Sequence, residues 1–247
     1  MSEMLPLFPL GTVLYPGLLL PLHIFEDRYR QLVRDLLANG EAPRFGVVAI
    51  REGRETGVSG VSALYPVGCT AVLRQVQKYP DGRYDIVTVG VQRFRLLSVD
   101  DSQPYLRGEV EMLPDGAGDP AEAELAARAV RPAFSDYLRA LASLAQHDPQ
   151  QAGAAAAAAD ERAAGNGDPD EPGAGSPDLP AAPVALSYVI AALMVVDLPD
   201  KQALLAEPDA AGRLAAERAM LAKETGMLRS LTSAPAPELR YSPYSNN

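Results

Sequence analysis

The stretch LPLFPLGTVLYPGLLLPLHIFEDRYRQLV, residues 5–33, decides the fold expected for this chain. Its first part consists of short apolar runs broken by prolines at positions 6, 9, 16 and 21. A membrane-spanning helix needs about 20 consecutive apolar residues, and proline breaks such a helix by removing a backbone donor. A secretory signal begins with basic residues, but no Lys or Arg precedes Arg28. The stretch therefore predicts strands rather than a membrane anchor or an export signal.

Strand and helix can be told apart within this stretch by the spacing of its apolar residues. The runs LPLFPL and LLLPLHI are typical of strands joined by a YPG turn, and their prolines indicate strand edges or ends. A helical spacing follows, with apolar residues at Tyr29, Leu32, Val33, Leu36 and Leu37. Acidic residues at 26–27 suit a helix start and Asn-Gly at 39–40 suits its end, so we predict a helix over 26–38.

Alternating patterns continue to about Leu113. VGCTAVLRQVQKY and RYDIVTVGVQRFRLLSV are joined by PDG, in which proline presets φ and glycine accepts a positive φ. This predicts a β-hairpin, with Gly90 marking a bulge or bend in its second strand. We therefore assign residues 1–113 to a β-rich subdomain.

Helical patterns dominate the remainder. A first helical segment is predicted over 114–146, where Pro132 would kink or restart the helix. Residues 147–183 are rich in Ala, Gly, Pro, Asp and Glu, which predicts a disordered insertion. A helical bundle is predicted over 184–233, with Asp200 and Asp209 as N-caps, and a flexible tail over 234–247.

These features together resemble one family. The stretch at 5–33, YPVGCTAVLRQVQKYPDGRYDIVTVGVQRFRL (65–96), PYLRGEV (104–110) and LPDKQALLAEPDAAGRLAAERAMLAKE (198–224) resemble, in order, the N-terminal substrate-binding domain of Lon proteases. The resemblance covers about 1–113 and 184–228, and the insertion between them departs from it. It implies an α+β fold, a β-barrel-like, PUA-like subdomain followed by a helical bundle. It also implies a free-standing module that recognises unfolded or tagged proteins without catalysis.

Composition and motifs exclude several other functions. The net charge of −10 and only three lysines argue against nucleic-acid binding, which requires clustered positive charge. One cysteine and two histidines cannot supply a structural zinc site, and the single cysteine favours a cytoplasmic location. No Gly-Lys-Ser/Thr P-loop and no match to the family's Ser-Lys protease motif is present, so we expect no enzyme activity and no cofactor.

Exposed aromatic side chains are the usual anchors at protein-recognition surfaces. We predict peptide contacts at Tyr15 in the YPG turn and at Tyr79 and Tyr84 flanking the hairpin tip, although turn or hairpin packing is an alternative for each. A structural role is predicted for the other residues of the family-like motif. These are Pro16, Gly17, His23, Phe25, Glu26, Arg28 and Tyr29.

The partner implied by the resemblance is an unfolded or tagged protein, or a Lon-type or other ATP-dependent protease that this chain would serve as an adaptor or regulator. A hydrolase with an unrecognised site remains a further alternative. The sequence leaves the client, the binding surface and the oligomeric state open. It predicts no nucleic-acid partner and no membrane association.

Overall fold

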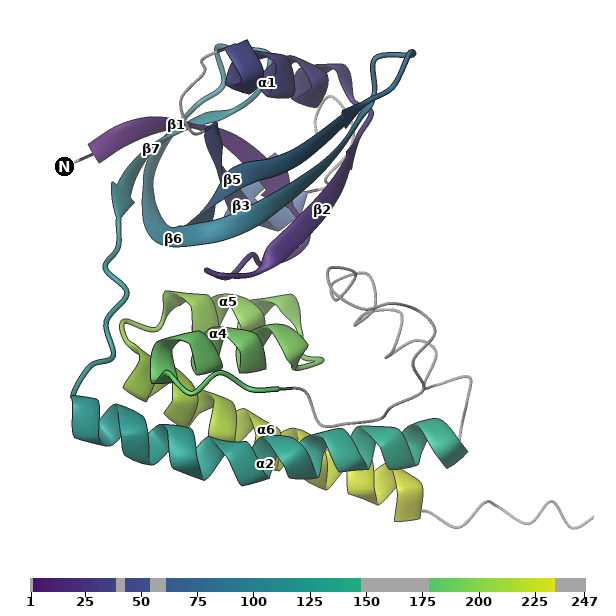
Figure 1. The fold of residues 1–247 in the computed structure, drawn as a ribbon, viewed down its shortest axis with the longest axis vertical. Helices are drawn as coiled ribbons and strands as arrows, with labels where there is room; N and C mark the ends of the chain where they lie inside the picture. Colours follow the sequence, from purple (N-terminus) through teal and green to yellow (C-terminus); the bar gives the residue numbers. More distant parts are fainter. Residues whose placement is uncertain (1, 39–42, 54–60, 148–177, 234–247) are drawn as a thin grey trace, which may run out of the picture.

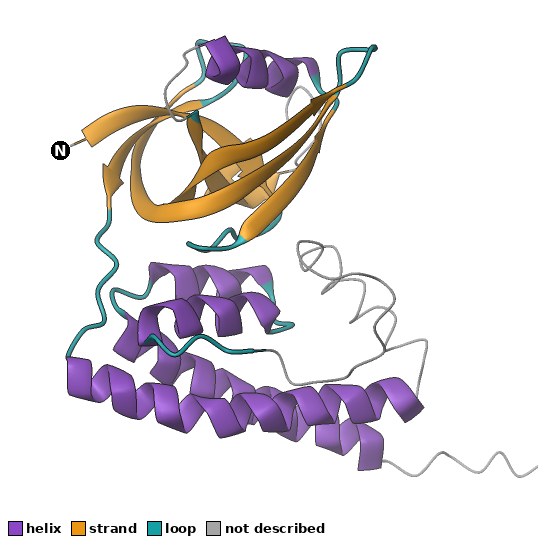
Figure 2. Ribbon diagram, viewed as in Figure 1, coloured by secondary structure: helices purple, strands orange, loops and turns teal. Residues whose placement is uncertain are grey.

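The computed structural model describes residues 2–38, 43–53, 61–147 and 178–233, which form a β-barrel stacked on a layer of helices (Figures 1 and 2). The strands are β1 (Ser2–Leu10), β2 (Leu19–Ile24), β3 (Arg44–Gly53), β4 (Val61–Leu64), β5 (Val67–Lys78), β6 (Tyr84–Asp100) and β7 (Arg107–Met112). The helices are α1 (Asp27–Ala38), α2 (Pro120–His147), α4 (Pro183–Leu193), α5 (Leu198–Ala206) and α6 (Ala210–Ser233). The predicted α+β class, with a β-barrel-like subdomain before a helical bundle, is confirmed.

The barrel closes because β1 pairs on both of its edges. It runs antiparallel to β7 and parallel to β3, which completes the circuit β1-β7-β6-β5-β3. Two further strands attach to this circuit: β4 pairs with β3, and β2 pairs antiparallel with the first part of β6. Helix α1 covers the end of the barrel away from the other helices (Figure 1).

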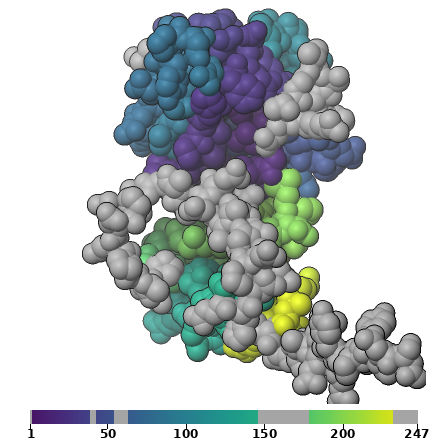
Figure 3. Space-filling view, turned by 90° about the vertical axis from the view of Figure 1, so that its right-hand side faces the viewer, coloured from purple at the N-terminus to yellow at the C-terminus, as the bar shows by residue number. Residues whose placement is uncertain are grey.

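The helical layer lies against the opposite end of the barrel. Helices α4 and α5 lie directly beneath the barrel, and the long helices α2 and α6 pack together below them (Figure 1). One hydrophobic core joins the layers, because Tyr15 and Val67 of the β-rich part belong to the same buried cluster as Phe134, Leu186 and Leu214. The barrel and helices also appear as two stacked masses in the space-filling view of Figure 3.

A buried arginine on β6 reinforces this junction. The Arg93 side chain is only 2% exposed, and its Nε donates to Asp115 Oδ1 at 2.6 Å. Its two Nη atoms donate to four carbonyl oxygens, one before α2 and three around the α5–α6 turn. These belong to Pro114, Leu205, Glu207 and Pro208. All five N–H donors of a guanidinium are thereby used.

The structure contains the first predicted helix and one of the two predicted N-caps. The helix predicted over 26–38 is α1, and the β-rich part ends at Met112. Asp209 caps α6, since its Oδ1 accepts a hydrogen bond from the Gly212 amide. Asp200, by contrast, lies inside α5, which already begins at Leu198 with a proline in its first turn, so its assignment as an N-cap was wrong.

Two other local predictions have different outcomes. Helix α2 continues through Pro132 without a restart. Gly90 adjoins a register shift between β5 and β6, as predicted. A close approach of the YPG turn also requires glycine at this position. A Cβ there would lie 2.2 Å from the Tyr15 carbonyl oxygen, so only glycine lets the YPG turn lie against β6.

The disorder predicted for 147–183 concerns residues that lie largely outside the described ranges, as does the tail at 234–247. The described chain resumes before α4, which starts with Pro183 at its first position.

Candidate functional site

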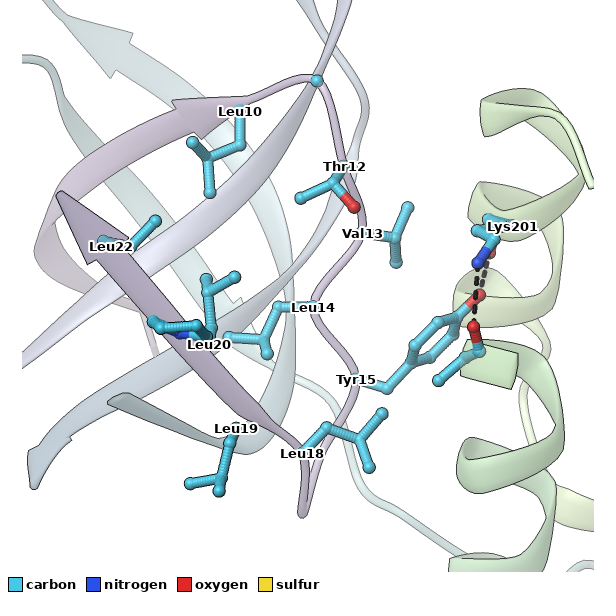
Figure 4. Close-up of a pocket in the computed structure, with 13 residues that line it drawn as sticks. Leu10, Thr12, Val13, Leu14, Tyr15, Leu18, Leu19, Leu20, Leu22 and Lys201 are labelled. Carbon is cyan, nitrogen blue, oxygen red and sulfur yellow. Dashed lines mark hydrogen bonds between the residues drawn. The ribbon is translucent and has the colours of Figure 1, made fainter. Parts of the chain in front are cut away.

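An apolar groove runs beside β2 and is the candidate binding site. It consists of two adjoining cavities, of about 400 and about 160 Å³, which share Leu10 and Leu22 in their walls. The larger cavity reaches the helical layer at Ala192 and Lys201 (Figure 4). We call the two cavities together the β2 groove. Its walls are formed by three parts of the chain: residues 8–15, residues 18–26 together with Tyr29, and the helical residues Ala192 and Lys201. Pro16 and Gly17 do not line it.

Successive side chains along β2 point to opposite faces of the strand, so some leucines pack in the barrel and another faces the groove. Leu18, Leu20 and Leu22 pack against the barrel core, and Ile24 is fully buried within it. Leu19 lines the groove without joining any hydrophobic core formed by the described residues. Because the Leu19 side chain is not part of a core, it is available to contact a ligand.

The far end of the groove is marked by Phe25. Its side chain lines the smaller cavity and is 54% exposed, which is unusual for a phenylalanine. The ring stacks loosely on His23, with 6.2 Å between ring centroids. Although the sequence predicted a structural role for Phe25, its exposure makes it an available aromatic anchor.

A polar network borders this end of the groove. The His23 and Asp85 side chains are joined at 2.5 Å, and the Tyr79 hydroxyl donates to the second Asp85 oxygen. The hydrogen bond from Tyr79 lowers the pKa of Asp85 most, and the hydrogen bond from His23 lowers it further. Arg83 on the hairpin approaches His23 Nε2 at 3.3 Å. This network holds the hairpin tip against β2 while leaving part of the Tyr79 ring accessible.

The three predicted contact tyrosines occupy different environments. Tyr79 is half-buried beside the groove rim, whereas Tyr84 is 3% exposed in the barrel core. Tyr15 is 1% exposed and points toward α5, where its hydroxyl donates to the Lys201 carbonyl oxygen at 2.9 Å (Figure 4). Neither Tyr15 nor Tyr84 is thus the exposed anchor that was expected, because tertiary packing covers both rings. Tyr79 alone of the three presents partly accessible surface.

Replacing Tyr15 by phenylalanine tests its role at the layer junction. Loss of the hydroxyl should lower the free energy of unfolding by about 1 kcal/mol, since the ring remains packed while the hydrogen bond to the Lys201 carbonyl is lost. Urea denaturation monitored by circular dichroism measures this change. An unchanged midpoint would show that the bond to the Lys201 carbonyl contributes nothing to stability.

The remaining motif residues lie where structural roles are expected. Gly17 has φ of +81° in the turn after Pro16, and its amide donates to the Gly90 carbonyl. Arg28 pairs with Glu26 at 2.9 Å. Tyr29 stacks on Phe8 with 4.0 Å between ring centroids, which anchors the start of α1 on the barrel.

Groups for metal or thiol chemistry are not assembled in the described part of the chain. Within it, no three His, Cys, Asp or Glu side chains lie close enough to hold a metal ion, and no helix is long and apolar enough to cross a membrane. Cys69 is fully buried, and burial raises the pKa of its thiol. The residues that line the β2 groove are mainly apolar, so the side-chain contacts that it offers a ligand are mainly apolar.

A third cavity, of about 540 Å³, lies between the first halves of α2 and α6. Four alanines and the charged Glu122, Asp209 and Arg218 are among its lining residues, with the 70% exposed Leu125 at its side. Unlike the β2 groove, it adjoins no strand, so it offers a ligand side-chain contacts but no strand edge.

Comparison with known proteins finds similar sequences and folds among the N-terminal domains of Lon proteases. The family model of the ATP-dependent protease La (LON) substrate-binding domain matches residues 4–223. The crystal structure of a Lon N-terminal domain protein from Xanthomonas campestris is similar, with a TM-score of 0.55, 23% identity and coverage of 89% of this chain and 98% of that one. The N-terminal domain of the Mycobacterium avium complex Lon protease is also similar, with a TM-score of 0.53, 16% identity and coverage of 91% and 98%.

Sequence relatives are much longer proteins. Lon protease 2 of Syntrophobacter fumaroxidans is 32% identical over 145 residues, which are 58% of this chain and 18% of that protein. Lon protease of Escherichia coli K12 is 25% identical over 226 residues, which are 91% of this chain and 25% of that protein. The chain thus spans a quarter or less of the length of these relatives.

Proposed function

The chain belongs to the Lon substrate-binding domain family, and from this premise we propose that it binds unfolded or tagged client proteins without catalysing a reaction. The observation that carries the proposal is the β2 groove, an apolar site open to a ligand on an otherwise acidic protein. Burial of apolar surface is the main source of affinity for an unfolded segment. The proposed clients are therefore segments rich in aliphatic and aromatic residues.

Two available side chains would supply much of the contact. Leu19 lies at the end of the groove near the helices and Phe25 at the other end, so an extended segment lying in the groove would meet both. Tyr79, near Phe25, is proposed as a contact at the rim. Lys201 is the charged residue in the wall of the larger cavity, and its Nζ already donates to the Ala192 carbonyl at 3.0 Å. Apolar contacts therefore dominate the interaction.

Fluorescence anisotropy of labelled unstructured peptides of graded hydrophobicity, titrated without nucleotide, tests the proposal. Affinity should rise with apolar content. The double variant Leu19→Asp/Phe25→Ser should bind the best peptide at least about tenfold more weakly, because each lost apolar contact is worth roughly 1 kcal/mol or more.

A matched control is the double variant Leu97→Asp/Val91→Ser. Both residues are exposed apolar side chains on β6, and neither lines the β2 groove. Its affinity should equal that of the unmodified protein. Equal loss in both variants would mean that binding does not use the groove, and no binding by any peptide would favour an adaptor that recognises a folded ATP-dependent protease.

The proposed setting of this activity is the cytoplasm. The chain has one cysteine and cannot form an internal disulfide, which fits a reducing compartment. Detection of the protein in the soluble fraction after gentle lysis, and its absence from export fractions, would support this location.

A further inference from the structure

The outer edge of β2 has no strand partner in the part of the chain that the structure describes. Strand β2 pairs with β6 along residues 19–24, and β2 has no pairing on its other side. The Gly90 amide donates to the Leu18 carbonyl, and the Thr88 hydroxyl donates to the Leu20 carbonyl. Because backbone groups alternate between the two sides of a strand, Leu19, Pro21 and His23 direct theirs away from β6.

Proline at position 21 fits this alternation and changes the chemistry of the edge. A proline within a sheet is tolerated where its missing amide faces away from the neighbouring strand. The outer edge therefore presents the carbonyls of Leu19, Pro21 and His23 but the amides of Leu19 and His23 only. The edge accepts more hydrogen bonds than it donates.

We propose that a client segment binds as an added β-strand on this outer edge of β2, beside the β2 groove. This inference rests on the proposed function and specifies its binding mode. Backbone hydrogen bonds to an exposed edge provide affinity that is independent of sequence, and neighbouring pockets select side chains. The added strand donates its amides to the three carbonyls, and Leu19 and Phe25 contact its apolar side chains.

An extended client fits this edge better than a second copy of the chain. Antiparallel pairing that matches the outward residues Leu19, Pro21 and His23 of both copies would place Pro21 opposite Pro21, where neither residue has an amide to donate. A client strand has an amide opposite Pro21 and satisfies its carbonyl. The unpaired edge thus favours a different polypeptide as its occupant.

A scan of N-methylated peptides tests the binding mode. One methyl group is placed in turn on each backbone amide of the tightest-binding peptide from the anisotropy series. Strand addition predicts weakening of about fivefold or more at alternate residues and little change at the residues between them, since only alternate amides face the edge. A uniform response along the peptide would overturn the proposal.

A protein variant provides the matching test from the other side. Leu19→Pro removes the outward amide at position 19 just as Pro21 lacks one naturally, while β2 keeps its pairing with β6. Its affinity should be about fivefold below that of Leu19→Ala, which removes the side chain and keeps the amide. Circular dichroism of both variants verifies that each is folded, and equal affinities would contradict strand addition.

The outcomes separate this inference from the proposed function. If Leu19→Asp/Phe25→Ser weakens binding but the methylation scan is flat, the groove binds clients without strand addition. If no unmethylated peptide binds, both the groove proposal and the added strand are wrong. Concentration-dependent dimerisation that Leu19→Pro abolishes would make a second copy the occupant and would also overturn the proposal.

Discussion

Replacement of Arg93 by methionine is expected to lower the free energy of unfolding by about 3–5 kcal/mol, the range for breaking a buried charge pair. Methionine keeps much of the apolar stem but none of the donors. The change leaves Asp115, whose side chain is 21% exposed, without its guanidinium partner, and it also leaves four carbonyl groups without their donor. Urea denaturation followed by circular dichroism measures the loss.

The arrangement around Arg93 also predicts how unfolding changes. One carbonyl partner, at 114, lies in the segment that connects the barrel to α2. The other three, at 205, 207 and 208, lie at the end of α5 and in the turn that leads to α6. Without these Arg93 contacts, the barrel and the helices should unfold less cooperatively. Far-ultraviolet circular dichroism and near-ultraviolet tyrosine signals should then no longer give the same unfolding midpoint.

Arg95→Met is the matched control, because Arg95 lies on the same strand and its side chain is 56% exposed where it pairs with Glu111. A surface pair of this kind is worth about 1 kcal/mol at most. Similar losses for Arg93→Met and Arg95→Met would show that burial and the carbonyl contacts of Arg93 do not stabilise the junction.

Local patterns sufficed to predict the barrel and most helices. The spacing from Tyr29 to Leu37 predicts the buried face of α1. Its first four apolar residues are buried, whereas Leu37 is 48% exposed. The proline in LLLPLHI likewise indicates an edge strand, and β2 pairs with β6 alone among the described strands. By contrast, β1, which contains Pro6 and Pro9, is not an edge strand, because it pairs with both β7 and β3. Such features depend on neighbours within a few residues, so they can be read from one sequence.

The junction could not be predicted in this way. Arg93 stands in VQRFRL, where alternation with apolar residues is typical of an exposed position, and Arg95 in the same pattern is in fact exposed. Arg93 is buried because helices that follow more than a hundred residues later cover it. Tyr15 is buried for the same reason, since Lys201 of α5 lies over its hydroxyl.

The candidate site was predicted only in part. The idea of a strand edge among the proline-containing first strands came from the sequence, and β2 has such an edge. The side chains that reach the groove did not, because exposure depends on which face the barrel leaves uncovered. Phe25 lies between the buried Ile24 and the half-buried Glu26, and nothing in its local pattern distinguishes it from a core phenylalanine.

Glu217 on α6 is a buried titratable group that the sequence conceals. Its side chain is fully buried, and neither carboxyl oxygen has a hydrogen-bond partner among the described residues. Burial raises the pKa of Glu217 to about 9, and the positive charge of Arg213, one turn earlier, only partly opposes this effect. The folded protein therefore keeps a proton on Glu217 at neutral pH, whereas the unfolded chain releases it.

This difference makes stability depend on pH in a defined direction. Below the ordinary glutamate pKa of about 4.5, both states hold the proton and the contribution of Glu217 to stability is fully present. As pH rises from there toward about 9, the unfolded state alone loses the proton, so the free energy of unfolding falls by up to about 1.4 kcal/mol per pH unit. Above that pH both states are ionised and the loss is complete.

Glu217→Gln should remove this dependence, because glutamine has nearly the same shape and does not titrate. The free energy of unfolding of the variant should exceed that of the unmodified protein by an amount that grows steadily from pH 5 to pH 8, measured by urea denaturation at each pH. Taking the difference between the two proteins cancels the titration of all other groups. Glu224→Gln, a change of the same kind at a half-buried position of α6, controls for the effect of the substitution itself. Parallel pH profiles for the unmodified protein and Glu217→Gln would mean that Glu217 is ionised inside the folded protein, with Arg213 as its counter-charge.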